Sequence, residues 1–302
     1  MIKPLVSIVL PTFNRSRFLP EAIESCIRQT YQNWELIIVD DCSTDRTPEV
    51  IARYVPQDRR IETVRHEINR QLPASLNTGF ALARGGLFTW IADDDRFRPE
   101  ALEVMEAFLE AHPNVDVVYS DRTLIDQDGN ILGYAHARPP DEMPYWNATG
   151  DFRLYRRKVA ETVGGYDEQL FLVEDYDFWL KAWGLHTFHA LHRDLYLYRS
   201  HSDSLSQARA QDIAEAVKRL LERCLLERDW DKKSRSLAYL RLAREAASIR
   251  DRRAASSYLI EAFKEDPRSI LHRLALPALI QLTAGPKAFE ALKRIFKTTG
   301  RR

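Results

Sequence analysis

Continuous apolar runs alternate with helix-like segments through the first 120 residues of the chain. The runs predict strands at residues 5–10, 35–39, 61–64, 87–91 and 115–119. They are apolar at successive positions rather than at every second one, as expected of strands covered on both faces. The helix-like segments between them fall at residues 17–29, 45–54, 73–83 and 99–111. This order predicts an α/β fold with a doubly wound, mostly parallel sheet, and two of the helices are expected to open on Pro73 and Pro99.

The pattern changes after Asp121. Residues 126–130 read as a hairpin turn between two short apolar runs, residues 174–183 as a helix and residues 195–198 as a strand. From about residue 207 the composition is helical, with periodic stretches at 213–226, 235–249, 253–263 and 269–282. We therefore expect one α/β domain over residues 1–208 and an α-helical C-terminal subdomain over residues 209–302.

Composition and charge exclude some classes of protein. Lys plus Arg equals Asp plus Glu at 44 each, so the overall charge gives no reason to expect a nucleic-acid partner. The three cysteines have no metal-ligand spacing, and no segment approaches a spanning helix, which together favour a cytoplasmic protein. The apolar stretch 270–280 and the basic residues that follow it could lie on the inner face of a membrane, or the stretch could pack on the catalytic domain.

Three adjacent carboxylates, Asp93, Asp94 and Asp95, follow the predicted strand 87–91. Like charges at the carboxyl end of a strand favour a cation there, and carboxylate oxygens suit Mg²⁺ or Mn²⁺. A solvated acidic turn closed by Pro99 is the alternative. Asp41, at the end of the second strand, is placed to accept a hydrogen bond from a base or ribose, while Asp45 reads as a helix cap.

No glycine-rich phosphate loop accompanies these residues. The chain has neither G-x-G-x-x-G nor G-x-x-x-x-G-K-[ST] after its first two strands. Phosphate groups would have to be held by another device.

Several segments together resemble family 2 glycosyltransferases of the GT-A fold. They are residues 6–15 (VSIVLPTFNR), 29–45 (QTYQNWELIIVDDCSTD), 69–70 (NR), 77–79 (NTG), 83–85 (ARG), 93–95 (DDD), 164–168 (GGYDE), 174–177 (EDYD) and 198–201 (YRSH). The resemblance covers about the first two-thirds of the chain. It divides residues 1–208 into a nucleotide-sugar half, about 1–121, and an acceptor half, about 122–208.

The resemblance implies an inverting transferase that uses a nucleoside-diphosphate sugar, commonly a UDP-sugar, and a divalent metal, Mn²⁺ or Mg²⁺. The residues that it implies for the nucleotide are Pro11, Thr12, Asn14, Asp41, Arg70 and Asp93. Asp94 would be the chief metal ligand, with Asp95 and His201 as further ligands. Many members carry an aspartate where this chain has Ala92, which leaves the division of roles within the triplet open.

The acceptor side is implied in the same way. Asp175 would be the general base that takes the proton from the attacking hydroxyl. Glu174, Trp146 and Tyr166 are expected near the sugar or the acceptor, which would be a saccharide or a lipid-linked molecule in polysaccharide or glycoconjugate synthesis. Aromatic side chains can stack on sugar rings, although core packing explains most of them.

Two other functions remain open at this point. A nucleotidyltransferase also uses acidic strand ends and a metal, but residues 11–17 lack the glycine-rich loop that usually grips a triphosphate. A non-catalytic scaffold is the other alternative, and the presence of Asp41, Asp94 and Asp175 together argues against it.

Overall fold

The computed structural model describes residues 3–268 and residue 275. Its strands are β1 (Val6–Thr12), β2 (Trp34–Asp40), β3 (Ile61–Arg65), β4 (Leu87–Trp90), β5 (Arg96–Phe97), β6 (Val117–Ile125), β7 (Ile131–Ala135), β8 (Arg153–Arg156) and β9 (Phe188–Arg199). Its helices are α1 (Leu19–Ile27), α2 (Thr47–Tyr54), α3 (Gln71–Leu82), α4 (Ala101–Ala111), α5 (Arg157–Val163), α6 (Glu174–Ala182), α7 (Leu205–Ala208), α8 (Ala210–Glu227), α9 (Lys232–Ser248) and α10 (Arg252–Glu265).

The strands form one sheet in the order β3-β2-β1-β4-β8-β6-β9-β5, and β7 pairs with β6. From β3 to β4 every pairing is parallel, so these strands end at the same edge of the sheet. The rest is mixed: β8 runs antiparallel to both β4 and β6, whereas β9 runs parallel to β6. The predicted α/β fold with a parallel-rich sheet is confirmed.

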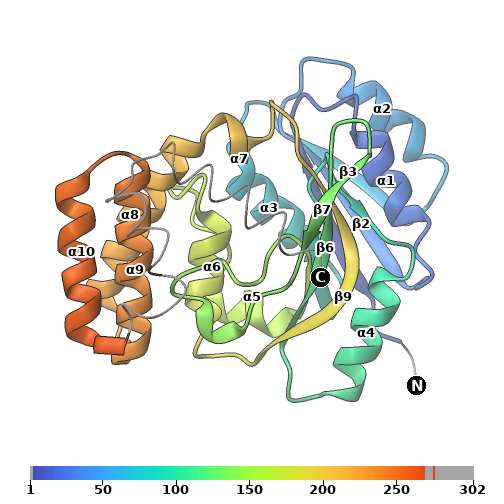
Figure 1. The fold of residues 1–302 in the computed structure, drawn as a ribbon. Coiled ribbons are helices and arrows are strands. Elements are labelled where there is room, and N and C mark those ends of the chain that lie inside the picture. Colours follow the sequence, from blue (N-terminus) through green and yellow to red (C-terminus); the bar gives the residue numbers. More distant parts are fainter. Residues whose placement is uncertain (1–2, 269–274, 276–302) are drawn as a thin grey trace. The chain divides into compact units, whose positions relative to one another are not determined.

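Helices cover both faces of the parallel half, as the continuous apolar runs predicted (Figure 1). The helices α1, α2 and α4 pack against Ile8, Leu10 and Ile38 on one face. On the other face, α3 approaches β1 so closely that a Cβ atom on Gly79 would lie 2.4 Å from a Val9 methyl group. A larger residue at position 79 would push the helix off the sheet.

The predicted helix starts at two prolines are wrong. Helix α3 begins at Gln71, two residues before Pro73, and α4 begins at Ala101, two residues after Pro99. The first starts early because the carboxylate of Asp41 accepts the backbone N–H groups of Arg70 and Gln71 and so satisfies donors that a helix start leaves unpaired.

The second half of the sheet differs more from the sequence-based expectation. The hairpin at 126–130 is confirmed, with the Asp126 carboxylate accepting the N–H groups of Asp128 and Asn130. Helix α6 also lies where predicted. The elements β5, β8 and α5 were not predicted, and β9 begins seven residues before the predicted strand at 195–198.

The chain forms two compact units. The first comprises Met1–Pro140 and Ala148–Ser204, and the second comprises Asp141–Asn147 and Leu205–Arg302. In the second unit α8 and α10 both pack on α9, and Tyr145 lies in a cluster with Leu237, Leu240 and Ala262. Among the helices that the structure describes, none has the length and apolar character needed to span a membrane.

Two predictions for the C-terminal region are not tested. The functional division at residue 208 stays a prediction. The fourth predicted helix, at 269–282, and nearly all of the stretch expected to contact a membrane lie outside the described residues.

Candidate active site

Asp94 contacts His201 at the carboxyl edge of the parallel strands. Its Oδ2 atom lies 2.9 Å from His201 Nε2, and only 3% of the His201 side chain is exposed. The imidazole packs on the ring of Phe18 at 4.9 Å, and its Nδ1 has no hydrogen-bond partner in the described part of the chain. Two neighbouring ligands of an octahedral ion at 2.1 Å lie about 3.0 Å apart, so this pair fits a divalent metal.

Asp95 has a different environment. One of its oxygens accepts the backbone N–H of Arg199 at 2.7 Å, and the other accepts the Tyr196 hydroxyl at 2.8 Å. Burial, followed by repulsion from Asp94, raises the pKa of Asp95 well above its ordinary value. Asp95 therefore ties the end of β9 to the triplet, and its role as a metal ligand stays a prediction.

The buried guanidinium of Arg199 connects the surrounding loops. It donates to the backbone carbonyl of Asp94 at 2.8 Å, to that of Gln127 at 2.9 Å and to the Glu21 carboxylate at 2.7 Å. Its carbon Cζ lies 4.8 Å from the centre of the Phe18 ring. These contacts fix the triplet, the β6–β7 hairpin and α1 relative to one another.

Asp93 faces the loop after β1. It accepts the Phe13 N–H at 3.3 Å, and its other oxygen lies 3.7 Å from Arg15 Nε. Burial and then the charge of Asp94 raise the pKa of Asp93 to about 7. A cation or a hydroxyl donor bound here would favour its ionised form.

Asn14 joins the loops that follow β1 and β2. Its carboxamide oxygen accepts the N–H groups of Thr44 and Asp45 at 2.8 and 3.2 Å, and its own N–H donates to Ser43. Asn14 adopts a left-handed backbone with φ of 53°, which asparagine tolerates better than most residues. Pro11 and Thr12 are the buried last residues of β1, and the nucleotide contacts predicted for all three residues stay predictions.

Asp41 is held by donors that the sequence did not suggest. One oxygen accepts the Arg70 N–H at 2.8 Å and lies 2.7 Å from His66 Nδ1, and the other accepts the Gln71 N–H at 2.8 Å. The second oxygen keeps one acceptor position for a base or ribose. The Arg70 side chain reaches Glu168 at 3.3 Å. His66 could have been found from topology, because it follows β3, whose last residue pairs with the end of β2.

Glu174 and Asp175 open α6. Glu174 is 4% exposed, and its Oε2 has no hydrogen-bond partner among the described residues. Burial and then the charge of Asp175 raise the pKa of Glu174 to about 8. Asp175 is less enclosed and accepts the Tyr176 N–H at 2.7 Å.

Arg153 is a residue that the sequence analysis missed. Its guanidinium is buried, donates to the Gly150 carbonyl at 2.7 Å and lies 4.5 Å from the Trp90 ring. Its charge favours the ionised form of Glu174. Within the described structure its Nε and Nη2 have no hydrogen-bond partner. No sequence signal marked it, because it lies in the unpredicted strand β8.

The two aromatic residues predicted near the acceptor lie in packed surroundings. Tyr166 is 5% exposed, stacks on Phe178 at 4.6 Å and exchanges two backbone hydrogen bonds with the Asn77 side chain. Trp146 belongs to the second unit, where the guanidinium groups of Arg241 and Arg244 lie over its ring. Their acceptor roles stay predictions.

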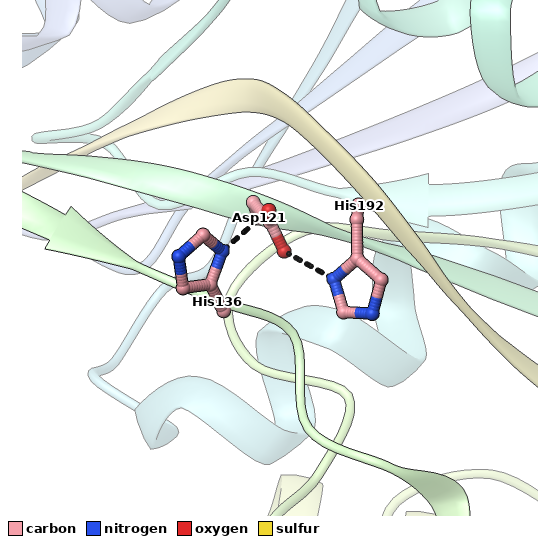
Figure 2. A group of neighbouring side chains, drawn as sticks. All are labelled: Asp121, His136 and His192. Atoms are coloured by element: carbon pink, nitrogen blue, oxygen red, sulfur yellow. Dashed lines mark hydrogen bonds and ion pairs between the residues drawn. The ribbon is translucent and has the colours of Figure 1, made fainter. Parts of the chain in front are cut away.

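Within the described residues, three potential metal-ligand atoms lie within 4.8 Å of one another only at Asp121, His136 and His192. Figure 2 shows both imidazoles turned toward the carboxylate. The predicted set Asp94, Asp95 and His201 does not form such a group, and the Asp95 oxygens instead accept hydrogen bonds from Arg199 and Tyr196.

Residues 7–164, about half of the chain, match the model of glycosyl transferase family 2. The chain belongs to this family. The expected glycosyltransferase class is thereby confirmed. WcaA of Escherichia coli (strain K12), named provisionally as a colanic acid biosynthesis glycosyl transferase, is 34% identical over 194 residues, which are 59% of this chain and 66% of WcaA. The family 2 chain spans only 25%, 66% and 35% of the lengths of three other curated relatives.

Solved structures agree on the fold of this family 2 chain. TarS of S. aureus (residues 1–349, with UDP-GlcNAc) has a TM-score of 0.65 at 17% identity, covering 97% of this chain and 92% of TarS. The mannosyltransferase PcManGT of Pyrobaculum calidifontis (with GDP-Man and Mn²⁺) has a TM-score of 0.65 at 14% identity, covering 93% and 88%. At this identity the likeness shows the fold alone, which is the GT-A fold expected from the sequence.

Proposed function

We propose that the protein transfers a sugar from a nucleoside-diphosphate sugar, a UDP-sugar, to a hydroxyl group with inversion at the anomeric carbon. The observation that carries the proposal is the contact between Asp94 and His201 beside Asp93, at the edge where the parallel strands end. Open α/β sheets bind ligands at this edge. The donors bound in TarS and PcManGT, UDP-GlcNAc and GDP-Man, support a nucleotide sugar, and the Mn²⁺ in the latter supports a metal.

Asp94 and His201 would hold Mn²⁺ or Mg²⁺. When bound, the ion offsets the negative charge that grows on the diphosphate as the bond to the sugar breaks. His201 would act as a neutral ligand through Nε2, and the packing on Phe18 keeps the ring in place. Asp93 would accept a ribose hydroxyl, and the remaining acceptor position on Asp41 would receive the base beside Arg70.

Asp175 is the proposed general base. Glu174 would keep its proton at neutral pH, since burial and then the charge of Asp175 raise the pKa of Glu174 to about 8. Asp175 would take the proton of the acceptor hydroxyl as its oxygen bonds to the anomeric carbon and the nucleoside diphosphate leaves. Glu174 and Arg153 would bound the space for the sugar or acceptor.

The acceptor is proposed to be a saccharide or a lipid-linked saccharide in polysaccharide synthesis on the cytoplasmic side of the membrane. The name of WcaA, which refers to colanic acid, supports this class.

Thermal shifts with UDP and GDP, each with and without Mn²⁺, test the proposal. We expect UDP with Mn²⁺ to raise the melting temperature and Asp94→Asn to remove the effect. Asp128→Asn is the matched control, because Asp128 is an exposed acid of the same unit whose partner is Arg17. The proposal would be overturned if neither nucleotide shifted the melting temperature, or if the shift were unchanged in Asp94→Asn.

A further inference from the structure

Asp121, His136 and His192 come from three segments that the sheet brings together. Asp121 lies in β6, and His136 immediately follows β7, whose last residue pairs with Arg122. His192 lies in β9 where the pairing with β6 is irregular: Ser120 pairs with Leu191, but Asp121 pairs with Asp194. The two extra residues form a bulge, a device that redirects side chains at the edge of a site.

The donor atoms already have nearly the spacing that a metal needs. Asp121 Oδ2 lies 2.9 Å from His136 Nδ1, and Asp121 Oδ1 lies 3.2 Å from His192 Nδ1. Ligands of a tetrahedral ion with bonds of 2.0–2.2 Å are about 3.3–3.6 Å apart. The three ligand atoms all lie within 4.8 Å of one another, so the side chains would have to close by no more than about 1.5 Å to hold a tetrahedral ion.

The surroundings support ligation by all three groups. Asp121 is 8% exposed, and its Oδ1 also accepts the Ala137 N–H at 2.7 Å, which orients the carboxylate as hydrogen bonds around metal sites do. The imidazoles are 81% and 65% exposed, so an ion can reach them from solvent.

We propose that Asp121, His136 and His192 bind a divalent transition-metal ion, Zn²⁺, at a site separate from Asp94 and His201. Two imidazoles and one carboxylate suit Zn²⁺ better than Mg²⁺, which prefers oxygen ligands. Three protein ligands leave the fourth position of a tetrahedral ion to water.

Strand β6 connects this site to the pair Asp94 and His201. Asp121 lies four residues, or about 13 Å of extended strand, before Ile125, the last residue of β6. The carbonyl of Ile125 accepts the N–H of Ser200, which is next to His201.

The bound ion would join the segment after β7 to the bulge of β9. The ion would therefore act as a cross-link between residues that are distant in sequence, since Asp121 is 15 positions from His136 and 71 positions from His192. Binding to the folded state alone raises stability with ligand concentration, so Zn²⁺ should raise the melting temperature without any nucleotide.

The test uses the full chain carrying Asp94→Asn, so that the nucleotide site contributes no metal ligand pair. Titration calorimetry with Zn²⁺ alone should give one site, and Co²⁺ should give the visible absorption of a tetrahedral ion. His136→Ala and His192→Ala should each weaken Zn²⁺ binding at least about tenfold. Circular dichroism of each variant checks that it is folded.

His112→Ala is the matched control, since His112 is an exposed histidine of the same unit that stacks on Phe108 instead of contacting Asp121. It should leave Zn²⁺ binding unchanged. The proposal is overturned if His112→Ala weakens binding as much as His136→Ala does, or if folded Asp94→Asn protein binds no Zn²⁺. Neither result bears on nucleotide binding, so the two proposals fail separately.

Discussion

The two acidic clusters of the first unit, Asp93 to Asp95 and the pair Glu174 and Asp175, differ in how their oxygens are used. In both clusters burial and a neighbouring carboxylate raise the pKa of at least one member. The triplet is braced by Arg15, Arg199 and His201. Glu174 Oε2, by contrast, has no hydrogen-bond partner in the part of the chain that the structure describes.

This difference indicates two kinds of chemistry. Braced carboxylates hold their positions, which suits the binding of a cation and a diphosphate. A buried carboxyl group with a raised pKa and an unpaired oxygen beside a second carboxylate suits the movement of a proton. We therefore expect substitution of Asp94 to affect the use of the donor and substitution of Asp175 to affect turnover.

The largest effect is expected from Asp94→Asn. Loss of a charged ligand to the metal should lower kcat/KM about 10³- to 10⁴-fold, because several kcal/mol of stabilisation of the leaving diphosphate disappears. Release of nucleoside diphosphate from a panel of nucleotide sugars measures this. A loss below tenfold would show that Asp94 is not the chief ligand.

Asp175→Asn should distinguish the roles of the two acidic clusters most clearly. Removing the general base should lower kcat about 10²- to 10³-fold, while the Mn²⁺-dependent thermal shift with UDP stays unchanged. An equal loss of nucleotide binding would contradict the division of roles. Asp177→Asn is a poor control because Asp177 is buried and paired with Lys181, so Asp128→Asn, at an exposed position, is preferable.

Asp95→Ala should act on stability. The substitution leaves the Arg199 N–H and the Tyr196 hydroxyl without their acceptors in a buried place. We expect a loss of about 2–5 kcal/mol in the free energy of unfolding, measured in urea. Glu161→Ala, which removes one exposed helical ion pair with Arg157, should cost less than about 0.5 kcal/mol. Similar losses in the free energy of unfolding for the two variants would show that Asp95 does not stabilise the contact between the triplet and β9.

Glu174→Gln should give the smallest effect at pH 5, and one that grows as the pH rises. A carboxyl group whose folded pKa is about 8 binds more protons folded than unfolded, so its contribution to stability is lost as pH rises from about 4.5 to 8. The melting temperature of the variant minus that of the wild type should therefore increase by at least about 3 °C from pH 5 to pH 9. A constant difference across this range would contradict the raised pKa.

The parallel half of the sheet was predictable because strands that are buried on both faces are continuous apolar runs in the sequence. The strands β1, β2 and β4 are largely apolar, buried runs, whereas the edge strand β3 is mostly exposed. Strand β8 begins and ends with arginine, and β5 has only two residues, so neither forms a continuous apolar run. Both depend on pairing with β4, β6 or β9 across long sequence separations.

The candidate site shows the same limit. Asp94, Asp175 and His201 were predicted from short motifs, and the structure places Asp94 and His201 in contact. His66 and Arg153 were missed because their partners are set by tertiary packing. The group of Asp121, His136 and His192 was missed because its members are up to 71 residues apart and meet only through two strand pairings and a bulge.

The position of Arg199 in the chain bears on the order in which the site is assembled during synthesis. Arg199 bonds to Glu21, 178 residues earlier, and to Asp94, 105 residues earlier. A growing chain therefore exposes every residue of the parallel half before the residue that braces the triplet has left the ribosome. Residues 7–164, the span of the family match, include all three aspartates but neither Arg199 nor His201. A fragment cut at that boundary would carry the acidic motif without the parts that make it a binding site.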